Sequence, residues 1–261
     1  MSLTSPSSAS AAASPWPYPL WIAHRGAGKL APENTLAAFR LGAAHGYRAF
    51  ECDVKLSRDG VPFLLHDATL QRTTSGHGPA EALDWSELAR LDAGGWHGRT
   101  YAGEPPPSFE AIARFCLRNA FALDIEIKAS PGSERITGEV VARAADALWA
   151  DAAPLPLLTS FQPASLEGAR QAAPRLPRAL LLDTLRSGWL DEARALGCVA
   201  VVTNYSVTDA GVLALVHGAG LRALVYTVND PATAHRLHAM GIDGIVTDAV
   251  DRFSPGAGVA D

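Results

Sequence analysis

The sequence has little cysteine, little methionine and no block of basic residues. Its 261 residues include 3 cysteines and 2 methionines, and the formal net charge is −5. An odd number of widely spaced cysteines argues against a disulfide framework or a zinc motif. Their apolar neighbours predict reduced core residues at Cys52, Cys116 and Cys198. Because nucleic-acid-binding proteins carry clustered positive charge, we expect no nucleic acid partner.

Long hydrophobic runs are also absent from the sequence. No apolar stretch approaches the roughly 20 residues needed to span a membrane, so no stable membrane association is expected. Residues 1–19 lack the lysine or arginine that opens a secretory signal peptide. Their Ser, Ala and Pro content predicts a disordered leader, and residues 254–261 are expected to form a flexible tail. We therefore expect a cytoplasmic protein.

From residue 20 onward, short runs of Ile, Val and Leu alternate with alanine-rich segments of helical period. We expect strands at residues 20–24, 49–55, 122–128, 156–161, 179–182, 199–203, 223–227 and 244–247. The helices expected between them are residues 35–46, 109–118, 133–149, 163–172, 188–196, 209–218 and 231–240. Runs that are apolar on both faces are typical of parallel strands. This alternation over residues 20–253 predicts one α/β domain, a (β/α)8 TIM barrel.

A doubly wound open sheet is the competing fold. Gly26 and Gly28 lie in the loop after the first expected strand, but neither a third glycine nor a helix follows directly. This is a weak match to a dinucleotide-binding loop, so the barrel is the preferred prediction.

One segment interrupts the alternation. Residues 67–107 are rich in glycine and proline, and only residues 84–91 have a helical pattern there. Asp84 and Glu87 have the spacing of a capping box, while Asn34 and Asp209 stand where N-caps of two other helices are expected. Long irregular insertions in compact domains are usually functional, so we expect a small subdomain over the barrel mouth, after the second strand region.

Polar residues recur on two of the expected strands. Glu51 and Asp53 are two residues apart, so both side chains point to one face of their strand. Two buried like charges need a cation, and an all-oxygen pair suits Mg²⁺ or Ca²⁺, with Mn²⁺ as an alternative. On another strand, Glu126 could supply a third carboxylate and Lys128 a positive charge, whereas Asp124 is expected to be a buried structural acid. A simpler interpretation of Glu51 and Asp53 is that they are solvated acids on an edge strand. A simpler interpretation of Glu126 and Lys128 is that they form a structural Lys–Glu network.

Two histidines end apolar runs. His24 and His66 are suited to proton transfer near neutral pH, although a lone histidine at such a position is more often structural. Arg25, next to His24, could bind a phosphate oxygen with its forked donors.

An ordered set of short motifs resembles the glycerophosphodiester phosphodiesterase family, in particular its soluble bacterial branch. The matching stretches run from residue 22 to residue 248: His24-Arg25-Gly26, Pro32-Glu33-Asn34-Thr35, Glu51-Cys52-Asp53-Val54, Asp59-Gly60, His66-Asp67, Gly103-Glu104, Ile125-Glu126-Ile127-Lys128, Ser160-Phe161, Thr227-Val228-Asn229 and residues 241–248, which end in Thr247-Asp248. Each motif alone is weak, but the ordered set is specific.

The resemblance implies a fold, an activity and a set of site residues. It implies a (β/α)8 barrel of the phospholipase-C-like phosphodiesterase type, and hydrolysis of glycerophosphodiesters to sn-glycerol 3-phosphate and an alcohol. The implied metal ligands are Glu51, Asp53 and Glu126, the implied acid/base pair is His24 and His66, and the implied substrate-binding residues are Arg25, Lys128, Phe161 and Tyr226.

The sequence departs from the family pattern at three positions. Tyr226 stands where tryptophan is usual and is expected to face the glycerol end of the pocket, Asp124 replaces a usual asparagine, and Ser108 replaces a usual threonine. Two alternative functions remain open: a lysophospholipase D-like enzyme acting on lipids, and a non-catalytic barrel that binds phosphodiesters. We expect a small-molecule substrate and either a monomer or a homodimer.

Overall fold

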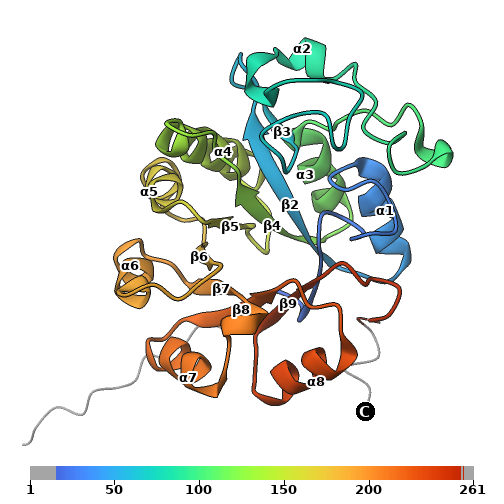
Figure 1. The fold of residues 1–261 in the computed structure, drawn as a ribbon. Coiled ribbons are helices and arrows are strands. Elements are labelled where there is room, and N and C mark those ends of the chain that lie inside the picture. The colour runs from blue at the N-terminus through green and yellow to red at the C-terminus, as the bar shows by residue number, and fades with distance from the viewer. Residues whose placement is uncertain (1–15, 254, 256–261) are drawn as a thin grey trace, which may run out of the picture.

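The computed structural model describes residues 16–253 and 255, and its centre is a closed parallel barrel (Figure 1). The parallel strands are β1 (Trp21–Ala23), β2 (Ala49–Leu56), β4 (Ala122–Ile127), β5 (Leu157–Ser160), β6 (Arg178–Leu182), β7 (Ala200–Asn204), β8 (Arg222–Tyr226) and β9 (Gly244–Thr247). Neighbouring strands follow the sheet order β1-β9-β8-β7-β6-β5-β4-β2, and β1 also pairs with β2. The predicted (β/α)8 barrel is confirmed.

The seam between β1 and β2 is the narrowest pairing in the barrel. These strands share the single register pair Ala23 and Phe50, whereas β1 and β9 share three. The loop after β1 adds a contact here, because the backbone N–H of Arg25 donates to Glu51 Oε2 at 2.9 Å.

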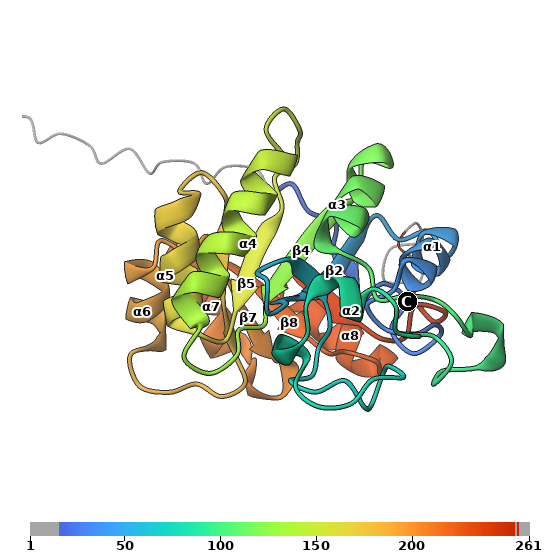
Figure 2. The same cartoon turned by 90° about the horizontal axis from the view of Figure 1, so that it is seen from above.

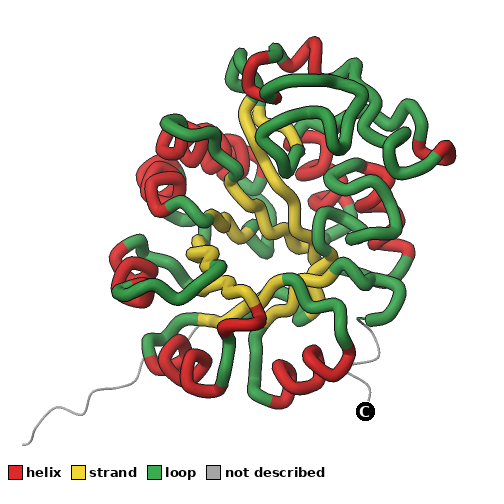
Figure 3. Tube along the Cα trace, in the orientation of Figure 1, coloured by secondary structure: helices red, strands yellow, loops and turns green. Residues whose placement is uncertain are grey.

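Helices connect the strands and surround the barrel (Figure 3). They are α1 (Leu36–Ala44), α3 (Phe109–Arg118), α4 (Glu134–Leu148), α5 (Pro163–Ala172), α6 (Trp189–Ala195), α7 (Ala210–Gly218) and α8 (Pro231–Ala239). Each strand is therefore covered on its outer face by helices and on its inner face by other strands, which explains the runs that are apolar on both faces.

The outer and inner faces of β2 illustrate how the barrel is filled. Phe50, Cys52 and Val54 belong to the large core between the strands and the helices. Ala49 points inward and belongs to a second, smaller core inside the barrel, which is rich in Ala, Val and Leu. Farther along β2, the inward positions are taken by charged residues instead of apolar ones.

Between β2 and the insertion lies a short strand that the sequence pattern does not show. β3 (Pro62–Leu64) pairs antiparallel with β2, and its three residues are too few to show a periodic pattern. The segment continues through η1 (Ala80–Ala82), α2 (Trp85–Leu88) and η2 (Arg99–Tyr101). The capping box of Asp84 and Glu87 is present, although α2 is shorter than the predicted helix.

The insertion has its own small core and lies to one side of the barrel. Phe63, Leu70 and Leu88 are buried in this core, and Trp85 packs against it. Figures 1 and 2 show the insertion beside β2, β3 and α1, so it borders the mouth of the barrel and does not cross it.

Helix starts agree with the sequence pattern except at α1. Asp209 caps α7 by accepting from the N–H of Val212, as predicted. The N-cap of α1 is Thr35, and the predicted Asn34 is wrong as a cap. Asn34 has a φ of 58° and turns its side chain into the barrel, where it bonds to Asp53. An amide at this position thus serves the site and not the helix.

The cysteines agree with the sequence prediction, because all three are buried and free. Among residues 16–253 and 255, no helix combines the length and apolar character needed to cross a membrane. The expected leader and tail lie almost entirely outside the described residues. Tyr18, however, donates to the carbonyl of Leu155, so the packed chain begins before the boundary expected at residue 20.

Gly42 provides a test of how tightly α1 packs on the loop after β1. A Cβ at Gly42 would lie 2.1 Å from the carbonyl oxygen of Gly26. Gly42→Ala should therefore lower the free energy of unfolding by about 1–3 kcal/mol, measured by urea denaturation. In α7, a Cβ at Gly218 meets nothing within 4 Å. Gly218→Ala should be neutral or stabilising by up to about 1 kcal/mol, and equal effects of the two changes would contradict this packing.

Candidate active site

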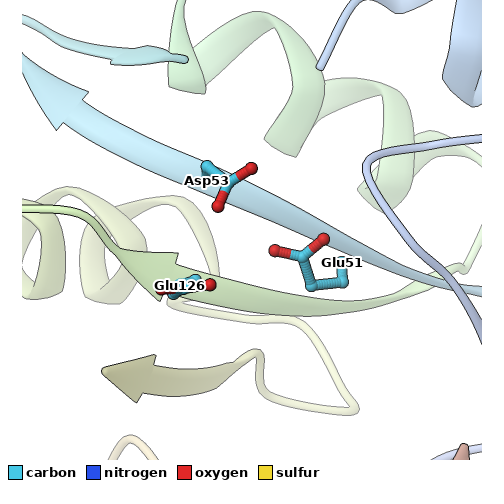
Figure 4. Close-up of side chains that lie close together, drawn as sticks. All are labelled: Glu51, Asp53 and Glu126. Carbon is cyan, nitrogen blue, oxygen red and sulfur yellow. The ribbon is translucent and has the colours of Figure 1, made fainter. Parts of the chain in front are cut away.

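Three carboxylates meet inside the barrel. Glu51 and Asp53 project from β2, and Glu126 projects from the neighbouring strand β4, where it is in register with Asp53 (Figure 4). One oxygen of each carboxylate lies within 4.8 Å of the others. All three residues are buried, with exposed fractions of 5%, 0% and 9%. The alternation of strand side chains, visible in the sequence, is what brings them to one face.

Burial and repulsion by neighbouring carboxylates raise the pKa of Glu51 and of Glu126, but not that of Asp53. Burial, followed by the nearby carboxylates of Asp53 and Glu126, raises the pKa of Glu51 well above its ordinary value. Burial and Asp53 raise the pKa of Glu126 to about 7. Burial also disfavours the charge on Asp53, but Arg25 and Lys128 outweigh it and lower the pKa of Asp53 to about 2.

Two oxygens of this cluster lack a hydrogen-bond partner among the described residues. They are Glu51 Oε1 and Asp53 Oδ1, and both are buried. A buried carboxylate oxygen without a partner is costly, and a bound cation removes that cost. The oxygen-only set of Glu51, Asp53 and Glu126 fits a hard divalent ion. The three carboxylates can therefore hold a metal ion.

Two cations flank the carboxylates. Arg25 Nε lies 3.2 Å from Asp53 Oδ2, and Arg25 Nη1 donates to Glu33 Oε1 at 2.8 Å. Lys128 Nζ lies 2.6 Å from Glu126 Oε1 and 3.6 Å from Asp53 Oδ1. An anion that enters the site would meet both positive side chains.

Each candidate catalytic histidine contacts an aspartate through its Nδ1. His24 Nδ1 is 2.6 Å from Asp248 Oδ1, and His66 Nδ1 is 2.7 Å from Asp67 Oδ1. A carboxylate at Nδ1 favours the proton on that nitrogen and leaves Nε2 for proton exchange. Burial lowers the pKa of His66, against the opposing effect of Asp53.

The predicted site residues surround one cavity of about 180 Å³. Eight of them line it: His24, Arg25, Glu51, His66, Glu126, Lys128, Phe161 and Tyr226. Asp53 is the ninth predicted residue and lies behind the lining, within the carboxylate cluster. Most of these residues follow the carboxyl end of a strand, which is where active sites of such barrels lie.

Two aromatic residues, Phe161 and Tyr226, line part of the cavity. The rings of Phe161 and Tyr226 contact edge to face at 5.8 Å, and Lys128 Nζ lies 5.5 Å from the Phe161 ring centre. The hydroxyl of Tyr226 donates to Asp183 Oδ1 at 3.4 Å. Asp124, at the base of the cavity, accepts a hydrogen bond from Thr159 and is buried.

Several residues that support the site were not predicted to belong to it. Asn34 holds Asp53 twice, by donating to Asp53 Oδ2 at 2.7 Å and by accepting from the Asp53 backbone N–H at 3.1 Å. Asn229 donates to Asp248 Oδ2 at 3.2 Å. Asn34, Asn229 and Asp248 all lie within the motifs that resemble the family. Their presence in those motifs is the sequence feature that could have indicated a role in the site.

The raised pKa of Asp124 predicts how stability depends on pH. Burial raises this pKa to about 7, although the bond from Thr159 opposes the shift. Between the ordinary value and about 7, the folded chain keeps a proton that the unfolded chain releases. The free energy of unfolding should therefore fall as pH rises through this range in EDTA. Glu51 and Glu126, whose pKa values are also raised, act in the same direction and His66 acts in the opposite one, so a variant is needed to isolate Asp124.

Asp124→Asn is that variant, because it keeps the shape and loses the charge. It should remove more than about 1.4 kcal/mol of the fall in unfolding free energy between pH 5 and pH 8, the equivalent of one pKa unit. Urea denaturation in EDTA measures both profiles. Parallel pH profiles for the unmodified chain and the variant would contradict the assignment.

Comparisons with known proteins find relatives along nearly the whole chain. A glycerophosphodiester phosphodiesterase from Caldanaerobacter subterraneus subsp. tengcongensis is 30% identical over 237 residues, covering 88% of this chain and 93% of the relative. The structure of an Oleispira antarctica phosphodiesterase in complex with the product sn-glycerol-3-phosphate has a TM-score of 0.83 and 31% identity, and the match covers 90% of this chain and 95% of that one.

A second solved structure, a glycerophosphodiester phosphodiesterase from Agrobacterium tumefaciens, has a TM-score of 0.75 and 29% identity, with 90% of this chain and 98% of that one covered. Residues 24–252 match the Glycerophosphoryl diester phosphodiesterase family. The fold, the clustered site and the match over nearly the whole chain lead to one conclusion: this chain belongs to the glycerophosphodiester phosphodiesterase family.

Proposed function

We propose that this chain hydrolyses glycerophosphodiesters to sn-glycerol 3-phosphate and an alcohol, with a divalent cation and two histidines. The observation that carries the proposal is the single cavity that His24, His66, Glu51 and Glu126 line together. The similar Oleispira antarctica phosphodiesterase was solved with sn-glycerol-3-phosphate, which supports this product.

Recognition of the substrate depends on positive charge. A phosphodiester is an anion, and Arg25 and Lys128 line the cavity beside the carboxylates. Their charges would orient the phosphate and stabilise the negative charge that grows in the transition state. Phe161 and Tyr226 would contact the glycerol part of the substrate through the edge-to-face pair that they form.

Glu51, Asp53 and Glu126 would hold the cation, which we expect to be Mg²⁺ or Ca²⁺, with Mn²⁺ as an alternative. When bound, it would supply positive charge against the phosphate and make the glycerol 2-hydroxyl more acidic. Glu51 Oε1 and Asp53 Oδ1 are buried and accept no hydrogen bond from the described residues, which supports a cation at this position.

The histidines would divide the proton transfers between them. His24, oriented by Asp248, would remove the proton of the glycerol 2-hydroxyl, whose oxygen attacks phosphorus. His66, oriented by Asp67, would donate its proton to the departing alcohol as the phosphorus–oxygen bond breaks. The product of this step is a cyclic phosphate. Water then opens it, with His66 taking the proton of water and His24 returning a proton to the 2-oxygen.

The shape of the site favours a small substrate over a lipid. A cavity of about 180 Å³ suits a glycerophosphodiester headgroup. In the described part of the chain, the exposed large apolar residues come from five separate places in the fold: Trp96 in the insertion, Ile136 in α4, Val199 before β7, Tyr205 after β7 and Leu215 in α7. Lysophospholipase D activity is therefore the less favoured alternative. A non-catalytic binding barrel is disfavoured because both histidines and all three carboxylates are present.

Replacing either histidine should reduce turnover far more than binding. His24→Gln and His66→Gln should each lower kcat by about 10²–10⁴-fold and change KM little, because each removes one proton transfer. Steady-state kinetics with glycerophosphocholine measure both constants. His97 lies in the insertion and contacts the Lys29 carbonyl, outside the cavity, so His97→Gln is the matched control. Turnover near that of the unmodified chain in either site variant would overturn the assignment.

Removal of the divalent cation should abolish activity. A coupled assay for glycerol 3-phosphate would be run with glycerophosphocholine and glycerophosphoethanolamine, and a coupled assay for free choline with lysophosphatidylcholine. Each would be run first in EDTA and then with Mg²⁺, Ca²⁺ or Mn²⁺ restored. We expect activity on the two water-soluble diesters that returns with one of the ions. Full activity in EDTA would remove the cation from the proposal, and preferential release from the lysophospholipid would favour the lipid alternative.

A further inference from the structure

Arg72, in the insertion, contacts two carboxylates at once. Its Nε and Nη2 donate to Asp67 at 2.6 Å and 2.9 Å. Its Nη1 and Nη2 donate to Glu33 at 2.7 Å each. A guanidinium that makes two forked pairs fixes the relative position of both carboxylates, which a single point charge cannot do.

Each of these carboxylates supports a different residue of the site. Asp67 accepts at His66 Nδ1, and Glu33 accepts from Arg25 Nη1. Arg25 in turn contacts Asp53 in the carboxylate cluster. Arg72 is thus the junction of one continuous chain of contacts, which runs from His66 through Asp67, Arg72, Glu33 and Arg25 to Asp53.

The backbone around Arg72 is held in place. Leu70 is fully buried in the core of the insertion, and its carbonyl accepts from both the N–H and the hydroxyl of Thr74. The turn that carries Arg72 is therefore anchored on both sides. The arginine side chain itself is 44% exposed, so it does not serve to fill a core.

We propose that Arg72 is a positioning residue that sets His66 and Arg25 in one geometry, and so couples proton transfer to phosphate binding. The proposal rests on the proposed function for its kinetic readout. Its physical basis is the pair of forked contacts, because displacement of either carboxylate would move the residue that it supports. The insertion would then have a part in catalysis without touching the substrate.

The charge state of the two carboxylates agrees with this role. The bonds from Arg72 lower the pKa of Asp67, although partial burial opposes the shift. Burial would raise the pKa of Glu33, and Arg72 and Arg25 together outweigh it. Both groups stay ionised at neutral pH, so each remains an acceptor for its partner in the site.

The first test compares Arg72→Gln with Arg72→Lys and with Arg58→Gln. Arg58 is a matched control, because it also binds two carboxylates, Asp84 and Glu87, but lies away from the cavity. Arg72→Gln should lower kcat and raise KM, and kcat/KM should fall by about 10–100-fold. A loss of this size is typical when a residue that orients functional side chains without contacting the substrate is replaced. Arg72→Lys should recover only part of this loss. Arg58→Gln should stay within about twofold of the unmodified chain.

The second test asks whether the two branches communicate through Arg72. Asp67→Asn and Glu33→Gln should have non-additive effects on kcat/KM, because they share one guanidinium, and additive effects in an Arg72→Gln background. A merely structural role would lower thermal stability without producing this change in additivity. Additive effects in the presence of Arg72, or kinetics of Arg72→Gln like those of Arg58→Gln, would overturn the proposal.

A third measurement does not need turnover. Calorimetric affinity for sn-glycerol 3-phosphate reports on Arg25, and the ¹⁵N NMR signals of the His66 ring report on its Nδ1 contact. Both should change in Arg72→Gln and remain unchanged in Arg58→Gln. If the unmodified chain hydrolyses no glycerophosphodiester while these signals change, the proposed function fails and the positioning role stands. If turnover is normal and neither signal changes, the positioning role fails alone.

Discussion

Repulsion among three buried carboxylates is the constraint on which the rest of the site depends. One oxygen from each of Glu51, Asp53 and Glu126 lies within 4.8 Å of the others, and all three side chains are buried. Such an arrangement is stable only if positive charge and hydrogen-bond donors surround it. Arg25 and Asn34 from the loop after β1, and Lys128 from the end of β4, meet that requirement. The same positive groups that make the cluster tolerable are those that an incoming phosphate would encounter.

The fold and the inward-facing residues were predictable because they follow from local periodicity. Strand residues two apart share a face, so the pairing of Glu51 with Asp53 could be read directly. Continuous apolar runs indicated parallel strands, and all eight lie in the barrel. β3 was missed because three residues are too few for a period. Asn34 was misassigned because a side chain before a helix serves equally well as a cap or as a donor to a distant strand, and local sequence does not distinguish them.

Contacts between distant segments could not be predicted in the same way. The pairing of His24 with Asp248 joins residues at opposite ends of the barrel sequence, and it exists only because β9 lies beside β1. Arg72 contacts Glu33, which lies in the loop after β1. Arg72 itself belongs to the insertion, whose sequence has no periodic pattern from which its path could be predicted. Sequence patterns identify which residues carry chemistry, whereas the orientation of those residues is set by closure of the barrel and by the path of its loops.

The narrow seam between β1 and β2 gives this closure a particular character. Ala23 and Phe50 form one register pair, and the next contacts across the seam belong to the site: Arg25 to Glu51 and Asp53, and Asn34 to Asp53. The loop after β1, which would bind the substrate, therefore also holds β1 against β2. Barrel closure and substrate binding depend on the same contacts, so a substitution that alters the pocket on this side would also change how firmly the barrel is closed.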